Sequence, residues 1–356
     1  MYFYELEIDK MLDKREQEVI NILKNRAKLS SKEIFEQISI DFSYATLKRI
    51  LTKLVNENYI ENKGKGKGTK YNISAIYEVI RPINIEQYYQ KEIDERKIKK
   101  QFNFEIISET LSRNNVFTKE ELNNLDVLHK KYLSNISQLT PNEYNKELDR
   151  LAIDLSWKSS QIEGNTYSLL ETERLLKEKL TASGKTKEEA VMLLNHKDAI
   201  DFLIENKDYL SPLSVSKIED IHSVLVKELQ IERNLRKRRV GISGTNYRPL
   251  ENEFQIKEAL KLSCEVINKK ENVFEKALLT LVLISYIQAF MDGNKRTARI
   301  VSNALLMNEN YCPLSFRTVD SIEYKKAMLL FYEQNNIASF KKIFIEQFEF
   351  AVNTYF

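Results

Sequence analysis

The chain has 356 residues, with 55 Lys and Arg against 52 Asp and Glu, so its formal net charge is only +3. This balance excludes a protein that binds nucleic acid over its whole surface, and any such affinity needs a local patch. Hydrophobic residues make up 42%, enough for a substantial core, whereas Gly 8 and Pro 5 are too few for a many-turned β-sandwich. Composition therefore favours a helix-rich protein with two or three domains.

Residues 1–78 have the pattern of a winged helix-turn-helix domain. Helical periodicity runs through 15–27, a Ser-to-Glu capping box at 30–33 begins a second helix, and 43–60 predicts a third. The stretch 61–74 alternates glycine with lysine, which suits the tip of a β-hairpin. The inner side of the third helix is predicted to carry Ala45, Leu47, Ile50, Leu51 and Leu54.

The third helix and the hairpin together are strongly basic. Between positions 43 and 70, seven cations stand against two carboxylates. We expect the helix to enter the major groove of DNA while the wing touches phosphates. The alternative is a protein-docking domain with a solvated hairpin. The candidate DNA-contacting residues are Lys48, Arg49, Lys53, Lys63, Lys65 and Lys67.

A charged connector, predicted to be helical and a candidate for homodimerisation, occupies 79–115. From 116 to 356 capped helices recur, with capping boxes at 118–121 and 186–189. This part is predicted to be all-α. The expected helices lie near 118–137, 141–161, 167–179, 186–206, 214–228, 254–269, 273–290, 295–309, 320–334 and 338–355.

Targeting and redox signals favour the cytoplasm. The stretch 1–18 has early acidic residues and no clean apolar core, which argues against a secretory signal. The most apolar stretch, 273–290, is interrupted by charged residues and fits a buried helix better than a membrane span. Cys264 and Cys312 lack metal-ligand spacing. We therefore expect a reduced, cytoplasmic protein with no membrane partner.

The stretch 288–299 joins two helical patterns across a break at Asp292-Gly293-Asn294. A glycine-bearing turn that feeds a helix N-terminus aims N–H groups at one point and creates an anion site. Arg296 and Arg299 share one helix face, and their guanidinium groups suit phosphate oxygens. Asp292 is a candidate ligand for a divalent cation that bridges phosphates. These features predict a nucleotide cradle; the alternative is an ordinary helical corner.

This stretch resembles the loop of the Fic/Doc (Fido) family, His-Pro-Phe-x-Asp/Glu-Gly-Asn-Gly-Arg-x-x-Arg. Here it reads Gln-Ala-Phe-Met-Asp-Gly-Asn-Lys-Arg-Thr-Ala-Arg from Gln288 to Arg299. The resemblance implies a Fic-fold helical bundle over 116–356 that binds ATP and Mg²⁺, with Asp292 on the metal. It assigns to the nucleotide Phe290, Asp292, Gly293, Asn294, Lys295, Arg296, Arg299 and, on a later helix, Tyr324.

The segment 239–250 resembles the family's flap, a β-hairpin that holds a target protein by strand addition. Alternating Val240 and Ile242 before a turn at Gly244 suit such a hairpin. The candidate flap residues are Ile242, Gly244, Thr245 and Tyr247. The basic run 233–239 just before it has two open interpretations, a solvated turn or a holder of an acidic partner.

The segment 159–165 resembles the family's inhibitory motif, Ser/Thr-x-x-x-Glu-Gly/Asn, at the end of an N-terminal regulatory helix. The resemblance implies that the glutamate pairs with Arg299 and occupies the space of the γ-phosphate, because carboxylate and phosphate compete for one guanidinium. The residues that match this motif are Ser159, Glu163, Gly164 and Asn165.

Gln288 stands where active family members carry the catalytic histidine. An amide cannot accept the proton of a target hydroxyl, and losing a general base typically costs about 10²–10⁴-fold. Lys295 replaces the second glycine, and the run Asn-Lys-Arg-Thr-Ala also resembles the Doc branch, which transfers a phosphoryl group. None of His129, His196 and His222 lies directly before the loop in sequence, so their approach to it in space is left open.

The sequence therefore predicts a nucleotide-binding Fic-fold protein, impaired in transfer, that acts as a DNA-binding or nucleotide-responsive regulator. The alternatives are an active protein adenylyltransferase or a Doc-like phosphotransferase held inactive by Glu163.

Overall fold

Side-chain caps fix where most helices of the protein begin. A computed structural model describes residues 11–356; the first ten, which include part of the predicted 1–78 domain and of the stretch assessed as a secretory signal, lie outside the described residues. The three predicted capping boxes are confirmed. Ser30, Thr118 and Thr186 each accept a hydrogen bond from the backbone three residues later, and a glutamate returns the bond.

The N-terminal unit is the predicted winged helix-turn-helix domain, with its own hydrophobic core. The hairpin pairs Ile60 with Ile73 in antiparallel register. Leu47 is buried, whereas Ala45 is exposed, contrary to prediction, because it lies off the buried stripe of the helix. The elements in chain order are α1 (Lys14–Asn25), α2 (Ser31–Phe35), α3 (Tyr44–Asn56), β1 (Ile60–Lys63) and β2 (Lys70–Ile73).

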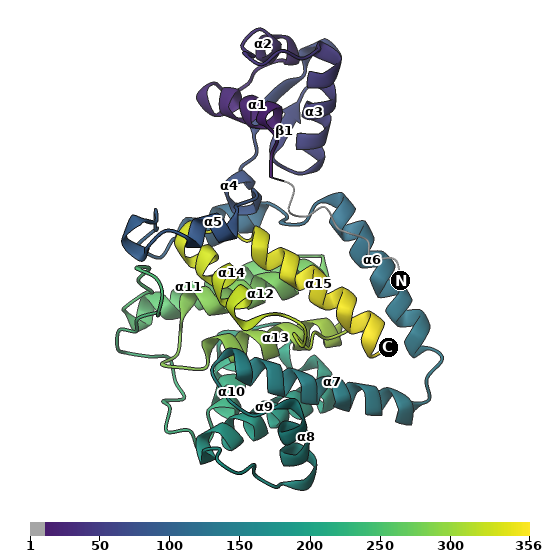
Figure 1. Cartoon of the computed structure of the whole chain (residues 1–356), viewed down its shortest axis with the longest axis vertical. Coiled ribbons are helices and arrows are strands. Elements are labelled where there is room, and N and C mark those ends of the chain that lie inside the picture. The colour runs from purple at the N-terminus through teal and green to yellow at the C-terminus, as the bar shows by residue number, and fades with distance from the viewer. Residues whose placement is uncertain (1–10) are drawn as a thin grey trace.

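The connector runs along the second unit as short pieces of helix (Figure 1). Arg96 forms an ion pair with Glu333 at 3.0 Å, and their side chains are 4% and 0% exposed. The Tyr88 hydroxyl donates to the same carboxylate at 2.7 Å. These contacts hold the connector against α14 of the same chain. Its role in a homodimer stays a prediction. Its pieces are α4 (Tyr77–Ile80), α5 (Ile85–Tyr89), a 3₁₀ turn (Ile93–Glu95) and a π-helical turn (Ile106–Leu111).

The second unit is all-α in its described secondary structure, as predicted, and every predicted helix is found within three residues of its expected bounds. A 3₁₀ turn (Lys207–Leu210) lies between α9 and α10. The helices are α6 (Lys119–Ile136), α7 (Pro141–Ile162), α8 (Leu169–Glu178), α9 (Lys187–Glu205), α10 (Val215–Leu225), α11 (Glu253–Lys269), α12 (Val273–Ile287), α13 (Asn294–Asn308), α14 (Ser321–Gln334) and α15 (Ala338–Thr354).

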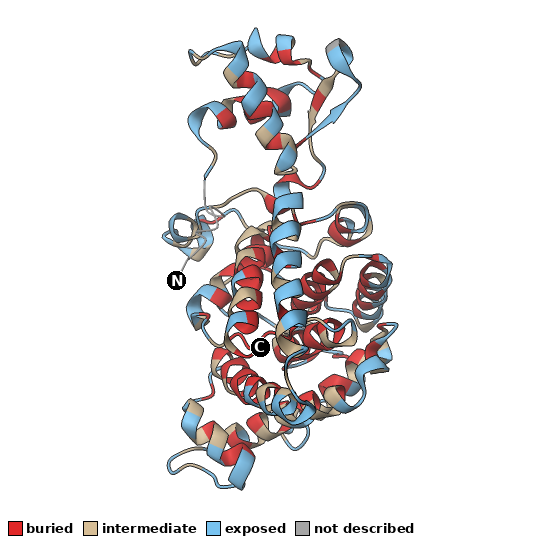
Figure 2. Ribbon diagram, turned by 90° about the vertical axis from the view of Figure 1, so that its right-hand side faces the viewer, coloured by how far each residue is buried: buried red, intermediate tan, exposed pale blue. Residues whose placement is uncertain are grey.

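Helix α12 forms the centre of this unit. All its side chains except that of Lys276 are buried, as expected for a helix that is apolar all round and packs against α11, α13 and α14 (Figure 2). None of the helices within residues 11–356 combines the length and apolarity needed to cross a bilayer. Because α12 ends at Ile287, it holds the start of the 288–299 loop in a fixed place.

The predicted β-hairpin of the flap is not formed. Residues 239–250 are extended with a turn at Ser243–Gly244, and they pair through one bridge from Arg248 to Gln101 of the connector. Arg96 of the connector also donates to the Gly244 carbonyl at 2.8 Å. The backbone partners therefore come from the connector, which a local hairpin pattern cannot reveal.

Candidate functional site

The loop between α12 and α13 is held in shape by its own backbone and by one asparagine. Gln288 ends α12 in the left-handed conformation, and Gly293 precedes α13 with φ +79°. The Asn294 side chain accepts from the Phe290 N–H and donates to the Phe290 carbonyl, both at 2.9 Å. Gly293 provides no side-chain cap, so the first N–H groups of α13 keep their donor capacity. This geometry suits an anion at the start of α13.

Two fully buried arginines lie on the first turns of α13. Arg296 bonds Asp292 at 3.0 Å, and its Nε and Nη1 have no partner among the described residues. Arg299 donates to Ser159 Oγ at 2.8 Å and to Glu163 at 2.9 Å, while its Nη1 is without a described partner. Buried donors on charged groups are costly when unsatisfied. These three free nitrogens therefore favour a bound anion.

Glu163 lies at the end of α7 between two cations. Its carboxylate contacts Arg299 at 2.9 Å and Lys295 at 2.7 Å. Burial alone would raise the pKa of Glu163, but Arg299 and then Lys295 outweigh it and hold the pKa at about 2. Gly164 and Asn165 shape the turn that follows, and Asn165 donates to the Glu189 carbonyl of α9. Of the four motif residues, Ser159 and Glu163 contact Arg299.

Gln288 keeps its amide within hydrogen-bonding distance of neighbouring groups. The amide nitrogen donates to the Ser285 carbonyl at 2.6 Å and to the Tyr332 hydroxyl at 3.4 Å. The amide oxygen accepts from Asn294 at 3.4 Å. The side chain can thus orient its neighbours but has no basic atom.

His222, which local patterns left without a role, lies directly beneath the loop. Its ring stacks on Phe290 with centroids 3.7 Å apart. Its two nitrogens face the carbonyls of Arg233 and Asp292, each at 3.0 Å, and burial lowers its pKa. Because the ring is fully buried and both nitrogens face backbone carbonyls, His222 supports the loop and does not replace the missing base.

His196 is the second histidine brought in by the fold. Its Nε2 lies 2.7 Å from Ser159 Oγ, and burial lowers its pKa well below the usual range. Since Arg299 donates to the Ser159 oxygen, the serine hydroxyl is free to donate to neutral His196. A series of hydrogen bonds therefore runs from His196 of α9 through Ser159 to Arg299. The third histidine, His129, stacks on Tyr311 away from the loop.

Arg236 departs from the solvated turn expected as one interpretation of the basic run 233–239, whereas a role of the run in holding an acidic partner or phosphate stays a prediction. Its side chain is fully buried and donates to the carbonyl of Gln288 at 2.6 Å. It also donates to the carbonyls of Arg238 and Leu250. Arg236 therefore ties the loop to the flap and is no solvated charge, which no local sequence signal indicated.

A cavity of about 390 Å³ opens between the loop, the flap and α14. It is larger than one phosphate group requires and falls within the range of small-molecule sites. Ile242 is the predicted flap residue that lines it. Its lining residues include Glu163, Val240, Ile242, Gln288, Met291, Asp292, Asn294, Lys295, Lys325 and Tyr332.

Several predicted contacts lie outside this cavity. Tyr324 is fully buried behind the loop, with its ring 5.2 Å from the Arg299 guanidinium. Tyr247 is also buried and donates to the Tyr286 carbonyl at 3.1 Å. Thr245 accepts from the Tyr247 N–H. These side chains position charged or backbone groups, and none of them lines the cavity.

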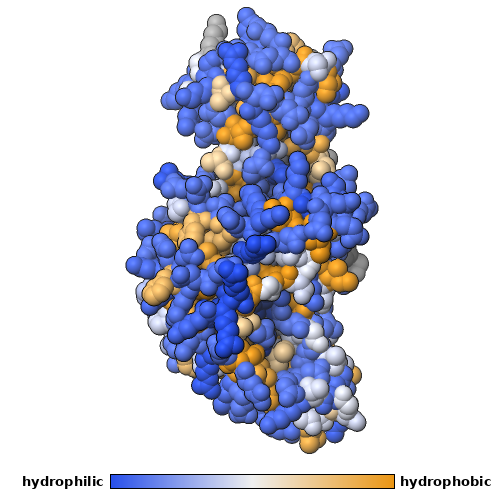
Figure 3. Space-filling view, turned by 90° about the vertical axis from the view of Figure 1, so that its left-hand side faces the viewer, coloured by the Kyte–Doolittle hydropathy of each residue, from blue (hydrophilic) through white to orange (hydrophobic). Residues whose placement is uncertain are grey.

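Some of the predicted DNA-contacting cations are paired with carboxylates, whereas others are exposed without such a pair. Lys53 is paired with Glu16 at 2.5 Å, and Lys63 lies 3.3 Å from Glu61. Lys65 is exposed on the wing, whereas the Lys67 side chain lies outside the described part of the chain. Polar side chains cover most of the face drawn in Figure 3. The exposed cations of α3 without an ion pair to any described residue are Lys48 and Arg49.

Comparisons with known proteins agree with both units. The model of the Fic/DOC family matches residues 212–306, and that of the penicillinase repressor family matches 12–126. A protein adenylyltransferase Fic of Nematostella vectensis is 26% identical over 183 residues, which cover 47% of this chain and 40% of the relative. The chain thus matches less than half the length of that relative.

Solved structures show the same fold. Fic-1 (residues 134–508) of C. elegans has a TM-score of 0.57 at 20% identity, covering 66% of this chain and 72% of that one. A Fic-domain-containing signalling protein of Bacteroides thetaiotaomicron has a TM-score of 0.55 at 19% identity, covering 65% and 94%. The chain therefore contains a Fic domain, preceded by a winged helix-turn-helix domain.

The ion pairs of Glu163 predict an acid-dependent loss of stability. An unfolded glutamate has a pKa near 4.3, and the folded value is about 2. The pairs therefore stabilise the fold above pH ~4.3, by about 3 kcal/mol, and this contribution is lost as the pH falls toward 2. Urea unfolding of the native chain and Glu163→Gln should differ most near pH 6, differ by about half as much at pH 3, and converge only below pH 2.

Glu309→Gln is the matched control, because this exposed carboxylate at the end of α13 makes no ion pair among the described residues. Its unfolding free energy should follow that of the native chain at every pH. A constant difference between native and Glu163→Gln from pH 6 to pH 3 would contradict the lowered pKa.

Proposed function

We propose that the loop binds a nucleoside triphosphate, with ATP as the ligand that the family resemblance implies, and that Glu163 competes with its terminal phosphate. The carrying observation is the Arg296–Arg299 pair, fully buried beside an uncapped helix start with three guanidinium nitrogens free of described partners. A phosphate group supplies the oxygens that such nitrogens lack. Glu163 already occupies the neighbouring Nη2 of Arg299, beside the free Nη1.

Asp292 would hold Mg²⁺ together with phosphate oxygens. Its carboxylate is 61% exposed at the cavity, and Mg²⁺ commonly takes one or two carboxylates plus phosphates. Among the described residues no cluster of three metal-ligating side chains exists, which fits a metal that arrives with the nucleotide. The ion would neutralise phosphate charge, while Asp292 keeps Arg296 in position through their 3.0 Å contact.

We further propose that the chain is a regulator with impaired transfer. Gln288 occupies the position of the family's base and has no basic atom, while the phosphate-facing residues remain. The alternative is a working transferase, because the Nematostella relative is named a protein adenylyltransferase. A target protein would then lie along the flap, and a Doc-like phosphotransferase is the other form of this alternative.

We also propose a cytoplasmic location. Both cysteines are buried free thiols, which is usual in a reducing compartment.

Removing the Glu163 carboxylate should expose the phosphate site. Replacing a charge-assisted contact of about 1.5–3 kcal/mol predicts about tenfold to hundredfold tighter Mg·ATP binding by Glu163→Gly than by the native chain, measured by titration calorimetry. Arg296→Ala in the Glu163→Gly background should remove this gain, and Glu309→Gln should bind like native. Absence of nucleotide binding by Glu163→Gly would overturn the cradle.

Restoring a base should restore transfer. With labelled ATP and cell lysate, Glu163→Gly should leave little label, and adding Gln288→His should raise labelling by about 10²–10⁴-fold. Mass spectrometry then distinguishes an AMP adduct from a phosphate adduct. Strong labelling by Glu163→Gly with Gln288 intact would instead support the working transferase.

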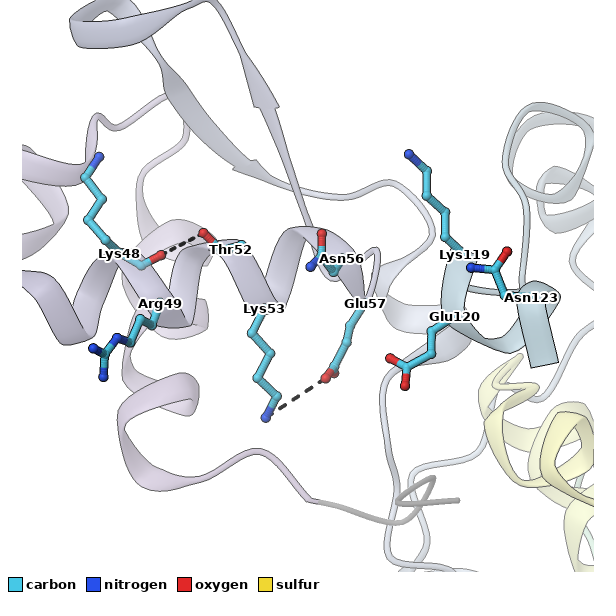
Figure 4. Close-up of a pocket in the computed structure, with 9 residues that line it drawn as sticks. All are labelled: Lys48, Arg49, Thr52, Lys53, Asn56, Glu57, Lys119, Glu120 and Asn123. Carbon is cyan, nitrogen blue, oxygen red and sulfur yellow. Dashed lines mark hydrogen bonds and ion pairs between the residues drawn. The ribbon is translucent and has the colours of Figure 1, made fainter. Parts of the chain in front are cut away.

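A second proposed function, DNA binding, rests on the winged helix and on its match to the penicillinase repressor family. Lys48 and Arg49 are both exposed on α3, extend to different sides of it in Figure 4, and make no ion pair with a described residue. The alternative is a domain that docks a protein. Phosphate contacts would distinguish the two, because they release counterions and make affinity fall with salt.

The double change Lys48→Ala, Arg49→Ala should reduce the slope of log affinity against log salt by about 2. Fluorescence anisotropy with genomic duplex fragments measures this slope. Lys257→Ala, an exposed lysine of α11, is the control and should leave it unchanged. No binding by the native chain near physiological salt would favour protein docking.

A further inference from the structure

The exposed side of α3 does not end at the border of the winged helix domain. A groove of about 750 Å³ separates the second half of α3 from the first turn of α6, the first helix of the second unit (Figure 4). Lys48, Thr52 and Asn56 follow one another at helical spacing along α3. Lys119 and Asn123 continue the lining on α6.

Two lysines, Lys48 of α3 and Lys119 of α6, extend to the same side of this groove. Figure 4 shows that Arg49, Lys53, Glu57 and Glu120 extend to the other side. Lys53 is already satisfied by Glu16 at 2.5 Å and lies 4.0 Å from Glu57. Neither Lys48 nor Lys119 has an ion-pair partner within residues 11–356.

The position of Lys119 relative to α3 is set by contacts on both sides of the joint. Asn58, just after α3, donates to the Phe117 carbonyl at 3.3 Å. Glu275 of α12 accepts from the N–H of Phe117 at 3.1 Å, and Lys341 of α15 contacts Glu121 at 2.7 Å. The first turn of α6 is therefore held by the core of the second unit at the edge of α3.

We propose that the DNA-binding surface extends from α3 across this groove onto α6, and that Lys119 contacts a backbone phosphate of the bound duplex. The inference rests on the proposed DNA-binding function. A helix seated in the major groove lies between two phosphate backbones, and cations beside it fix its register on the duplex. Lys119 supplies such a cation from the second unit, so DNA bound to α3 touches both units of the chain.

The test uses the full-length chain and a fluorescein-labelled duplex of about three helical turns. Lys119→Ala should weaken binding and lower the salt slope by about 1, which is the signature of one lost phosphate contact. Lys130→Ala is the matched control, because Lys130 is an exposed lysine farther along the same helix. It should bind like the native chain. Lys119→Arg should keep the native slope, and alanine at position 119 suits a helix, so the fold is preserved.

Glu120→Ala should change the affinity for DNA in the opposite direction to Lys119→Ala. Removing this carboxylate, which lies on the same turn of α6 but extends to the other side, should tighten binding slightly, because less negative charge then lies beside the duplex.

Each outcome separates the two proposals. Equal slopes for Lys119→Ala and Lys130→Ala, with Lys48→Ala weakened, would overturn the extension onto α6 and leave DNA binding by the winged helix intact. Salt-independent or absent binding by the native chain would overturn DNA binding itself, and the extension with it.

Discussion

Arg299 holds a full positive charge where water does not reach, and the candidate site depends on how that charge is balanced. Its guanidinium is fully buried and bonds Ser159 and Glu163. A buried charge is tolerated only with partners of excellent geometry, so the end of α7 must lie against the start of α13. His196 continues this arrangement through Ser159 into α9. Three helices that are distant in sequence, α7, α9 and α13, therefore share one electrostatic requirement.

Helix α12 connects this charged region with the joint between the two units. Its first turn carries the buried Glu275, which accepts from the backbone N–H groups of Val116 and Phe117 just before α6. Its last residue, Ile287, precedes Gln288 and the loop. Because nearly the whole helix is buried, it cannot move without disturbing the core. The joint beside α3 and the phosphate-facing loop are thus attached to opposite ends of one rigid element.

The loop region keeps the two buried arginines of α13 but has a glutamine at position 288. Arg296 and Arg299 lie buried on the first turns of α13, and Lys295 adds a cation beside Glu163. Gln288 removes the atom that would accept a proton. His222 supports the loop backbone from beneath, with its nitrogens on carbonyl groups.

The sequence by itself determined the helix bounds, the two units and the position of the glycine-bearing turn before α13. These depend on signals within a few residues: capping boxes such as that at Thr118, hydrophobic periodicity, and the break at Asp292-Gly293-Asn294. Only the tertiary structure decided that Arg236 and His222 support the loop, that the flap pairs with the connector, and that Lys53 is occupied by Glu16. Each of these contacts joins residues far apart along the chain, so their meeting depends on how the helices pack, which no local pattern encodes.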